Sequence, residues 1–276
     1  MSIQSEDDYG IGLTDPYPSP DDYRLDEIAK EMRDDASHGA RALEQAPPEA
    51  KVNLNVPVIH QLWDTSDDFD GHWACGPTSA TMTLAYYGLI QPHPITVHQP
   101  WAHESPYGWY VSNECEVGGK VWSNRSRSPN GAFAGVYGAL VGKHSGGWMT
   151  GAYTPPPPSG MGMMPFMNQA LAGIGNSIAC YWGGPGSGNF PADPGTIMRE
   201  SLDRGHPIIL AGTVFGWGHL LVVRGYVEAP GGTQWVVNDP FGYRTKGKFG
   251  GGNVVYEWAE MNPRTLYVIS GEGRPA

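Results

Sequence analysis

The chain has 276 residues and a mass of 29.8 kDa, a length that suits one large domain or two small ones. Hydrophobic residues make up 40% of it and aromatic residues 11%, which excludes a chain that is disordered throughout. The net charge is −11, and residues 1–50 hold thirteen Asp or Glu against four Lys or Arg, a net of −9. The remaining 226 residues therefore carry only −2, without the clustered positive charge that nucleic-acid binding needs.

Three cysteines, Cys75, Cys115 and Cys180, are too few for a disulfide-stapled scaffold, and no C-x-x-C metal motif is present. The first ten residues, MSIQSEDDYG, lack the basic and apolar regions of a signal peptide, so we expect the protein to be made in a reducing cytoplasm. Proline, glycine and amide residues interrupt the apolar segment 161–180, which favours a buried helix over a membrane span.

Residues 1–50 are predicted to form an acidic N-terminal extension. Proline and glycine punctuate residues 1–20, which we expect to be an extended arm, and the spacing of Leu, Ile and Met predicts a helix over residues 21–44. The extension either lies solvated on the main domain or acts as a prosegment or docking arm that orders on a partner.

The main domain is predicted to span residues 51–276. Residues 53–63 are expected to be strand-like, and residues 75–88 predict a helix with Pro77 in its first turn and a glycine at its end. From about 91 to 194 the chain is rich in Gly, Pro and Trp, which indicates an irregular insert. Two short helices are predicted inside the insert: 131–143 and 166–175.

The last third of the chain is predicted to be a short helix followed by a sheet. The helix covers residues 196–204 and is closed by Gly205. Five β-rich runs follow it: 207–215, 219–227, 234–242, 253–260 and 265–270. The segment GYVEAPGGTQW predicts a hairpin, because APGG supplies the positive φ angles that a tight reversal requires. A helical part followed by an antiparallel sheet is an α+β arrangement.

Cys75 is the first candidate for catalysis. It directly precedes a Gly-Pro pair at a predicted helix N-terminus, where the helix dipole lowers the pKa of a thiol from its usual value of about 8.5. The alternative is a buried, inert cysteine. His219 opens an apolar strand after the Gly-rich turn at 215–218, and Asp239 ends the following strand, so a hairpin can bring the two together. These residues have the order of a nucleophile, a base and a residue that orients the base.

Three segments carry a family resemblance: VPVIHQLW, WACGPTSATMTLAYYG and GHPIILAG…GWGHLLVVRGY…WVVNDPFG. Together they resemble the papain-superfamily cysteine peptidases related to the bacteriocin-processing, double-glycine-leader peptidases. The resemblance covers residues 56–88 and 205–242. It implies a papain-like α+β fold, in which the helix that carries the catalytic Cys75 packs on a C-terminal antiparallel sheet.

The resemblance also implies roles for single residues. Gln61 matches the glutamine that helps to form the oxyanion hole, although the segment TSDDFDGHW lengthens the usual gap between this glutamine and Cys75. Asp239 matches the residue that orients His219. Asn238 is the alternative for that role, because Asn orients the histidine in some papain-like sites.

The resulting hypothesis is a cysteine peptidase that needs no metal or cofactor. Free-standing relatives of this kind cut cell-wall peptides, so we expect a peptidoglycan substrate and the role of a phage lysin or a virion-associated wall hydrolase, acting at the bacterial cell wall. Two alternatives stay open. One is a virion or tail structural or docking protein that retains the fold, and the other is an acyltransferase or transglutaminase-like enzyme, in which an amine replaces water.

Other residues are weaker candidates. His72 neighbours Cys75, but we interpret it as a cleft or surface residue. Histidines recur every five residues before Glu104 and could suggest a metal site, although this step fits neither a helix nor a strand: His93, His98 and His103. Tryptophans of the insert could line a peptide or glycan groove or fill its interior: Trp101, Trp109, Trp122 and Trp148. Cys115 and Cys180 are interpreted as structural free thiols.

Overall fold

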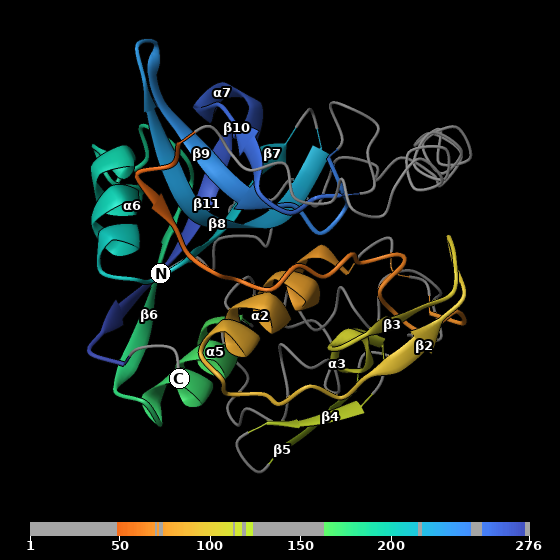
Figure 1. Cartoon of the computed structure of the whole chain (residues 1–276). Coiled ribbons are helices and arrows are strands. Elements are labelled where there is room, and N and C mark those ends of the chain that lie inside the picture. The colour runs from red at the N-terminus through yellow and green to blue at the C-terminus, as the bar shows by residue number, and fades with distance from the viewer. Residues whose placement is uncertain are drawn as a thin grey trace, which may run out of the picture.

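A computed structural model describes residues 49–69, 71, 74–112, 114–117, 120–123, 163–214, 217–243 and 250–273 (Figure 1). Several sequence-based predictions lie outside these residues: the arm and helix within 1–48, the helix at 131–143, His72, Trp148, and the side chains of Cys115 and Trp122.

The centre of the structure is a seven-stranded antiparallel sheet with the strand order β10-β9-β8-β7-β11-β6, to which β1 adds by pairing with β8. Its strands are β1 (Val52–Asn53), β6 (Asn176–Trp182), β7 (Ile208–Val214), β8 (Trp217–Ala229), β9 (Gly232–Asn238), β10 (Val254–Tyr256) and β11 (Pro263–Gly271). Two small hairpins lie apart from it: β2 (Ile95–Val97) with β3 (His103–Ser105), and β4 (Glu114–Val117) with β5 (Lys120–Ser123).

Helices cover both faces of this sheet (Figure 1). The described helices are α2 (Cys75–Tyr86), α3 (Gly108–Ser112), α5 (Met163–Ala172), α6 (Pro194–Asp203) and α7 (Trp258–Met261), and α3 lies beside α2, away from the sheet. Alternate residues of each strand face opposite sides, so Ile209 and Ala211 of β7 pack in one core with α2 and α5. Ile208 and Leu210 pack in a second core with α6. The mixed helix and antiparallel sheet confirm the α+β expectation.

Helix α2 is buried along its length rather than on one face. Ten consecutive residues, from Cys75 to Leu84, are buried, and most of them are small: Gly, Ala, Ser and Thr. One of its buried hydroxyl groups bonds within the helix, since Thr83 Oγ1 donates to the Ser79 carbonyl at 2.9 Å.

The strand predicted over residues 53–63 is wrong beyond its first residue, because β1 ends at Asn53. The rest of the segment is held by side chains: Asn238 Nδ2 donates to the carbonyls of Val56 at 3.0 Å and Pro57 at 3.2 Å. Pro57 has no N–H to offer to a ladder. The predicted turn at 215–218 is also corrected, since β8 already begins at Trp217.

The predicted hairpin and the last long helix are confirmed. Strands β8 and β9 pair with Ala229 opposite Gly232, and Gly232 has a φ of 119°. Helix α6 begins at Pro194, with the Asp193 carboxylate accepting from the Thr196 N–H at 3.0 Å, and Gly205 follows it with a φ of 86°. Gly205 and Gly232, the residues with a positive φ, are therefore among those that marked these turns in the sequence.

The interval 91–194 contains more than irregular chain. It includes α5, which agrees with the helix predicted at 166–175, and β6, which pairs with β11 in the main sheet. None of the described helices has the length and apolar character that crossing a bilayer requires.

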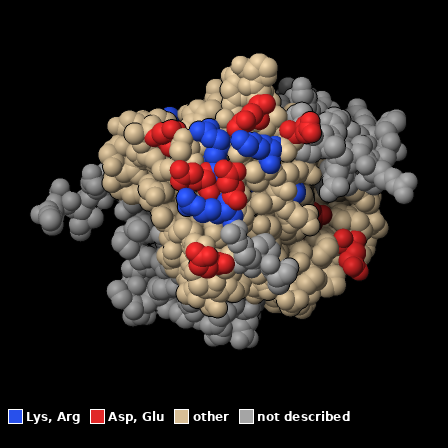
Figure 2. Space-filling view, turned by 60° about the vertical axis from the view of Figure 1, so that its left-hand side comes forward, with Lys and Arg blue, Asp and Glu red and all other residues tan. Residues whose placement is uncertain are grey.

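Opposite charges alternate on the face that carries α6, as Figure 2 shows. Lys51 Nζ lies 3.0 Å from Glu228 Oε1, and Arg204 Nη2 lies 3.3 Å from Glu200 Oε2. All four side chains are more than half exposed. Water and salt screen such pairs, so the stability of the fold depends on the two cores rather than on this face.

A buried histidine joins three elements, which gives a first prediction. His206 Nδ1 accepts from the Tyr87 hydroxyl at 2.8 Å, and its Nε2 donates to the Gly271 carbonyl at 3.1 Å. Tyr87→Phe should lower the free energy of unfolding by about 1–2 kcal/mol, because it leaves a buried imidazole nitrogen without its donor. Urea denaturation measures this change.

Tyr110→Phe is the matched control, since the Tyr110 hydroxyl bonds to the Gln91 carbonyl in an exposed position. Its effect should stay within about 0.5 kcal/mol. Equal effects of the two variants would contradict the proposed difference between the two bonds.

Candidate active site

His219 and Asp239 meet at one end of the β8–β9 pair. His219 Nε2 lies 2.7 Å from Asp239 Oδ1, and the two side chains are 3% and 0% exposed. An ionised carboxylate only accepts hydrogen bonds, so Nε2 is the donor of this contact. The carboxylate thus fixes both the orientation and the tautomer of the ring, and Nδ1 is the nitrogen left for proton transfer.

Two further donors hold the Asp239 carboxylate. The Phe241 N–H donates to Oδ1 at 2.9 Å, and the Tyr256 hydroxyl donates to Oδ2 at 2.9 Å. Tyr256 lies on β10 and is fully buried. Sequence reasoning missed Tyr256, because its backbone lies opposite Trp235 on β9, four residues before Asp239, and only its long side chain reaches the carboxylate.

Asn238, the alternative orienter, faces away from His219. Its Nδ2 donates to the carbonyls of Val56 and Pro57, and its Oδ1 accepts from Arg224 Nη1 at 3.2 Å. Consecutive residues of an extended chain point to opposite sides, so Asn238 and Asp239 serve different neighbours. Among the two, Asp239 is the one that contacts His219.

Gln61 connects the turn before Cys75 with the turn after Asp239. The Gly71 carbonyl accepts both from Gln61 Nε2 and from the Ala74 N–H, each at 2.9 Å. The Gln61 N–H donates to the Pro240 carbonyl at 2.7 Å. Gln61 thus lies close to the turn that leads into Cys75, although the two residues are far apart in the sequence. The Gln61 side-chain amide carries two N–H donors and uses one of them on the Gly71 carbonyl.

Cys75 begins α2 and is 8% exposed. It belongs to the same buried cluster as Leu220, the neighbour of His219 on β8, and Ala211, which lies opposite Leu220 on β7. The start of α2 therefore shares a core with the residue that follows His219 in the chain. Cys180 lies on β6, and its burial raises the pKa of its thiol to about 12, which makes it unreactive.

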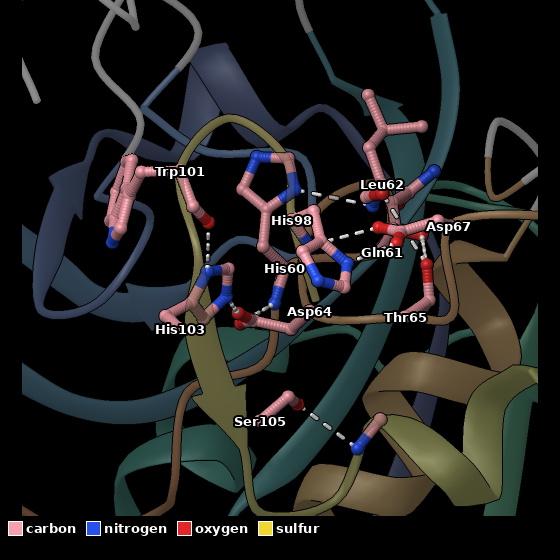
Figure 3. A network of polar contacts seen from close by, with 11 residues as sticks. His60, Gln61, Leu62, Asp64, Thr65, Asp67, His98, Trp101, His103 and Ser105 are labelled. Carbon is pink, nitrogen blue, oxygen red and sulfur yellow. Dashed lines mark hydrogen bonds and ion pairs between the residues drawn. The ribbon is translucent and has the colours of Figure 1, made fainter. Parts of the chain in front are cut away.

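Asp64 ties the segment before Gln61 to the β2–β3 hairpin (Figure 3). Its Oδ2 accepts from the His60 N–H at 2.6 Å, and its Oδ1 lies 2.9 Å from His103 Nε2. His103 Nδ1 lies 2.8 Å from the Trp101 carbonyl. Both ring nitrogens of His103 therefore face acceptors, which requires a doubly protonated ring, and the bond to Asp64 raises the pKa of His103.

His60 has the opposite environment. Its ring stacks on Trp63 with centroids 4.7 Å apart and lies 6.4 Å from the Phe241 ring. Burial lowers the pKa of His60 to about 4, so the ring is neutral at physiological pH. A neutral ring here adds no positive charge beside Asp239.

The other histidines of the insert have partners of their own. His98 Nδ1 lies 2.7 Å from Asp67 Oδ2, and the His98 N–H donates to Asp67 Oδ1 at 3.0 Å. His93 stacks on Trp109 with centroids 4.3 Å apart. In the described part of the chain, His93, His98 and His103 therefore do not converge on one point, and two of them fasten the β2–β3 hairpin to residues 64–67.

Comparison with known proteins assigns this chain to no family. A scan against protein-family models finds no match, and a search of the curated proteins finds none either. What the chain does is therefore inferred from its own residues.

Close backbone packing at Gly71 gives a second prediction. A Cβ at this position would overlap the carbonyl oxygen of Gln61. Gly71→Ala should lower the free energy of unfolding by about 1–3 kcal/mol, because the two backbone segments must separate. Urea denaturation measures it, with Gly188→Ala as the control, since a Cβ at Gly188 meets no atom within 4 Å. A variant at Gly71 as stable as the control would contradict the packing.

The His103–Asp64 pair gives a third prediction, about pH. A raised folded-state pKa means that His103 stabilises the fold fully below its unfolded value near 6.5 and loses this contribution as pH rises through the raised value. His103→Gln should therefore cost up to about 1 kcal/mol near pH 5.5 and progressively less above neutral pH.

Urea denaturation of both proteins from pH 5 to 9 measures this difference. His98→Gln is the control, since 68% of the His98 side chain is exposed, and it should change little at any pH. A cost for His103→Gln that grows with pH would reverse the assigned sign.

Proposed function

We propose that the protein is a cysteine peptidase, with Cys75 as the nucleophile, His219 as the proton carrier and Asp239 as the residue that orients His219. The observation that supports this most directly is the buried 2.7 Å contact between His219 Nε2 and Asp239 Oδ1. A histidine locked in this way by a buried carboxylate is the usual partner of a nucleophile.

The position of Cys75 supports its assigned role. The first residue of α2 lies at the positive end of a 12-residue helix, which favours a thiolate over a thiol. A thiolate beside a protonated imidazole is the reactive form of a cysteine nucleophile. The position of the thiol on a fully packed helix limits its movement, as a catalytic group requires.

The proposed reaction is acyl transfer in two steps. The Cys75 thiolate attacks the peptide carbonyl and forms a sulfur–carbon bond, and His219 Nδ1 delivers its proton to the leaving amine as the carbon–nitrogen bond breaks. Water then attacks the thioester while His219 takes one of its protons, and the carbon–sulfur bond breaks, which releases the new carboxylic acid and restores the thiolate and the imidazolium. Asp239 holds the ring through both proton transfers.

Gln61 is proposed to stabilise the negative charge that develops on the carbonyl oxygen. Its Nε2 is fastened to Gly71, in the turn that leads into Cys75. Together with the Cys75 backbone N–H it would supply two donors, each worth about 3 kcal/mol of transition-state stabilisation. The same bond network supports a papain-like arrangement of helix and sheet.

The substrate class rests on the family resemblance of the sequence. It extends the proposal to peptide bonds of bacterial peptidoglycan, cut by a phage lysin or a virion-associated wall hydrolase that acts at the cell wall. If an amine instead of water accepts the acyl group, the same residues catalyse a transfer reaction, and the products distinguish the two.

The fourth prediction tests the nucleophile. Purified peptidoglycan incubated with the wild-type protein should release peptides with new amine termini, identified by mass spectrometry, and Cys75→Ala should lower the rate at least about a thousandfold. Circular dichroism checks that the variant is folded. New amide linkages in place of new termini would indicate a transferase.

Thiol alkylation supplies a readout that does not depend on the substrate. Iodoacetamide should modify Cys75 much faster than Cys180, whose thiol pKa is raised to about 12. Equal peptide release by wild type and Cys75→Ala, or equally slow alkylation of both thiols with no release, would overturn the proposal and favour a structural or docking role.

A further inference from the structure

We infer that Tyr256 is a positioning residue, whose hydroxyl group holds the Asp239 carboxylate and thereby sets the basicity of His219. This inference rests on the proposed function and adds a fourth member to the residues that control Cys75. It is carried by the bond from the Tyr256 hydroxyl to Asp239 Oδ2 at 2.9 Å.

The two oxygens of Asp239 have different donors. Oδ1 accepts from His219 Nε2 at 2.7 Å and from the Phe241 N–H at 2.9 Å, whereas Oδ2 accepts from Tyr256. Donors on both oxygens fix the plane of the carboxylate and prevent its rotation about the Cβ–Cγ bond. Because His219 follows that plane, Tyr256 orients the imidazole through Asp239.

The burial of Asp239 and Tyr256 makes the hydrogen bond between them important for the carboxylate. Asp239 and Tyr256 are 1% and 0% exposed, so bulk water cannot replace the phenol as a donor. A phenol that donates to a carboxylate disperses its negative charge. With the phenol removed, the carboxylate should attract the Nε2 proton more strongly and stabilise the imidazolium form of His219.

The charged and titratable groups around Asp239 come from several elements. His60 lies close enough to interact electrostatically with Asp239, but burial lowers its pKa to about 4, and it stays neutral over the range tested below. Arg224 contacts Asn238 and the Val56 carbonyl, on the other side of β9. His219 is therefore the titrating partner of Asp239, with Cys75 next along the proposed path of the proton.

Tyr256→Phe removes the hydroxyl and keeps the ring. Tyr243→Phe is the matched control, because the Tyr243 ring packs against Tyr256 with centroids 5.9 Å apart, whereas the hydroxyl that donates to Asp239 Oδ2 belongs to Tyr256. Both variants lose one phenolic oxygen from the same aromatic pair. A difference between them therefore measures the contact with the carboxylate.

The first readout is the pH profile of Cys75 alkylation by iodoacetamide, which needs no substrate. In Tyr256→Phe the upper limb of the profile, where the imidazolium loses its proton, should move up by about 0.5 pH unit or more. Peptide release should fall about tenfold in kcat with little change in KM. Tyr243→Phe should leave the profile where it is.

The second readout is the proton NMR signal of His219 Nε2–H in histidine-labelled protein, recorded also in the Cys75→Ala background. A stronger bond to Asp239 should move the signal further downfield in Tyr256→Phe than in the wild type. This measurement holds even if the variant is less stable, provided that the signal of the folded protein is observed.

The outcomes separate the two proposals. An unchanged or lowered upper limb in Tyr256→Phe, with a reactive wild-type Cys75, would overturn the role of Tyr256 and leave the peptidase proposal standing. A slow-reacting Cys75 in the wild type would overturn the peptidase proposal, whereas the NMR signal would still report whether Tyr256 controls the His219–Asp239 bond. Equal shifts in Tyr256→Phe and Tyr243→Phe would also overturn the inference, since they would indicate a general loosening of the aromatic pair.

Discussion

A carboxylate that is shielded from water persists in its charged form only where the protein itself supplies hydrogen-bond donors. Asp239 has donors from three parts of the chain: an imidazole on β8, a backbone N–H just after β9 and a phenol on β10. Strands β8, β9 and β10 must therefore pair in a register that places all three donors around one carboxylate. The turn after Asp239 also accepts from the Gln61 backbone, so the carboxylate anchors the segment that leads to α2 as well.

Side-chain hydrogen bonds, rather than regular secondary structure, position the chain segment that lies near Asp239. The segment from Val56 to Asp64 forms no ladder; its carbonyls accept from Asn238 and Arg224, and its last turn is fastened by Asp64 to His103. Such a segment has its position set by distant residues rather than by its own propensity. A substitution in the β2–β3 hairpin, such as one at His103, should therefore alter the position of the residues around Gln61 through Asp64, without altering the packing of the main core.

The elements that the sequence predicted well are those with local signals. Helix α6 has a capping Asp193 and is followed by Gly205, and the β8–β9 hairpin has Gly232 where φ is positive. The order of Cys75, His219 and Asp239 could likewise be interpreted in advance, because a hairpin brings residues on its two strands together. Each of these signals acts over a short stretch or between neighbouring strands.

The features that the sequence did not predict depend on contacts between distant segments. Tyr256 lies opposite Trp235 on an edge strand and reaches Asp239 with its side chain, and Asp64 meets His103 across 39 positions. Neither pair has a local pattern that distinguishes it from an ordinary strand tyrosine or a loop aspartate. The choice between Asn238 and Asp239 has the same origin, since adjacent residues differ only in the side of the chain that each one faces.

The complete burial of α2 also affects how the protein can diverge by mutation. Gly76, Ala80 and Thr81 have neighbours on every side, and a larger side chain at any of them would displace packed atoms at a cost of about 1–3 kcal/mol. Most proteins have only a small reserve of stability above the level that function needs. Variation that alters selectivity is therefore tolerated more readily in the exposed turn around Asp67 and Asp68 than on the helix itself, so this helix should diverge slowly while the turns around it diversify.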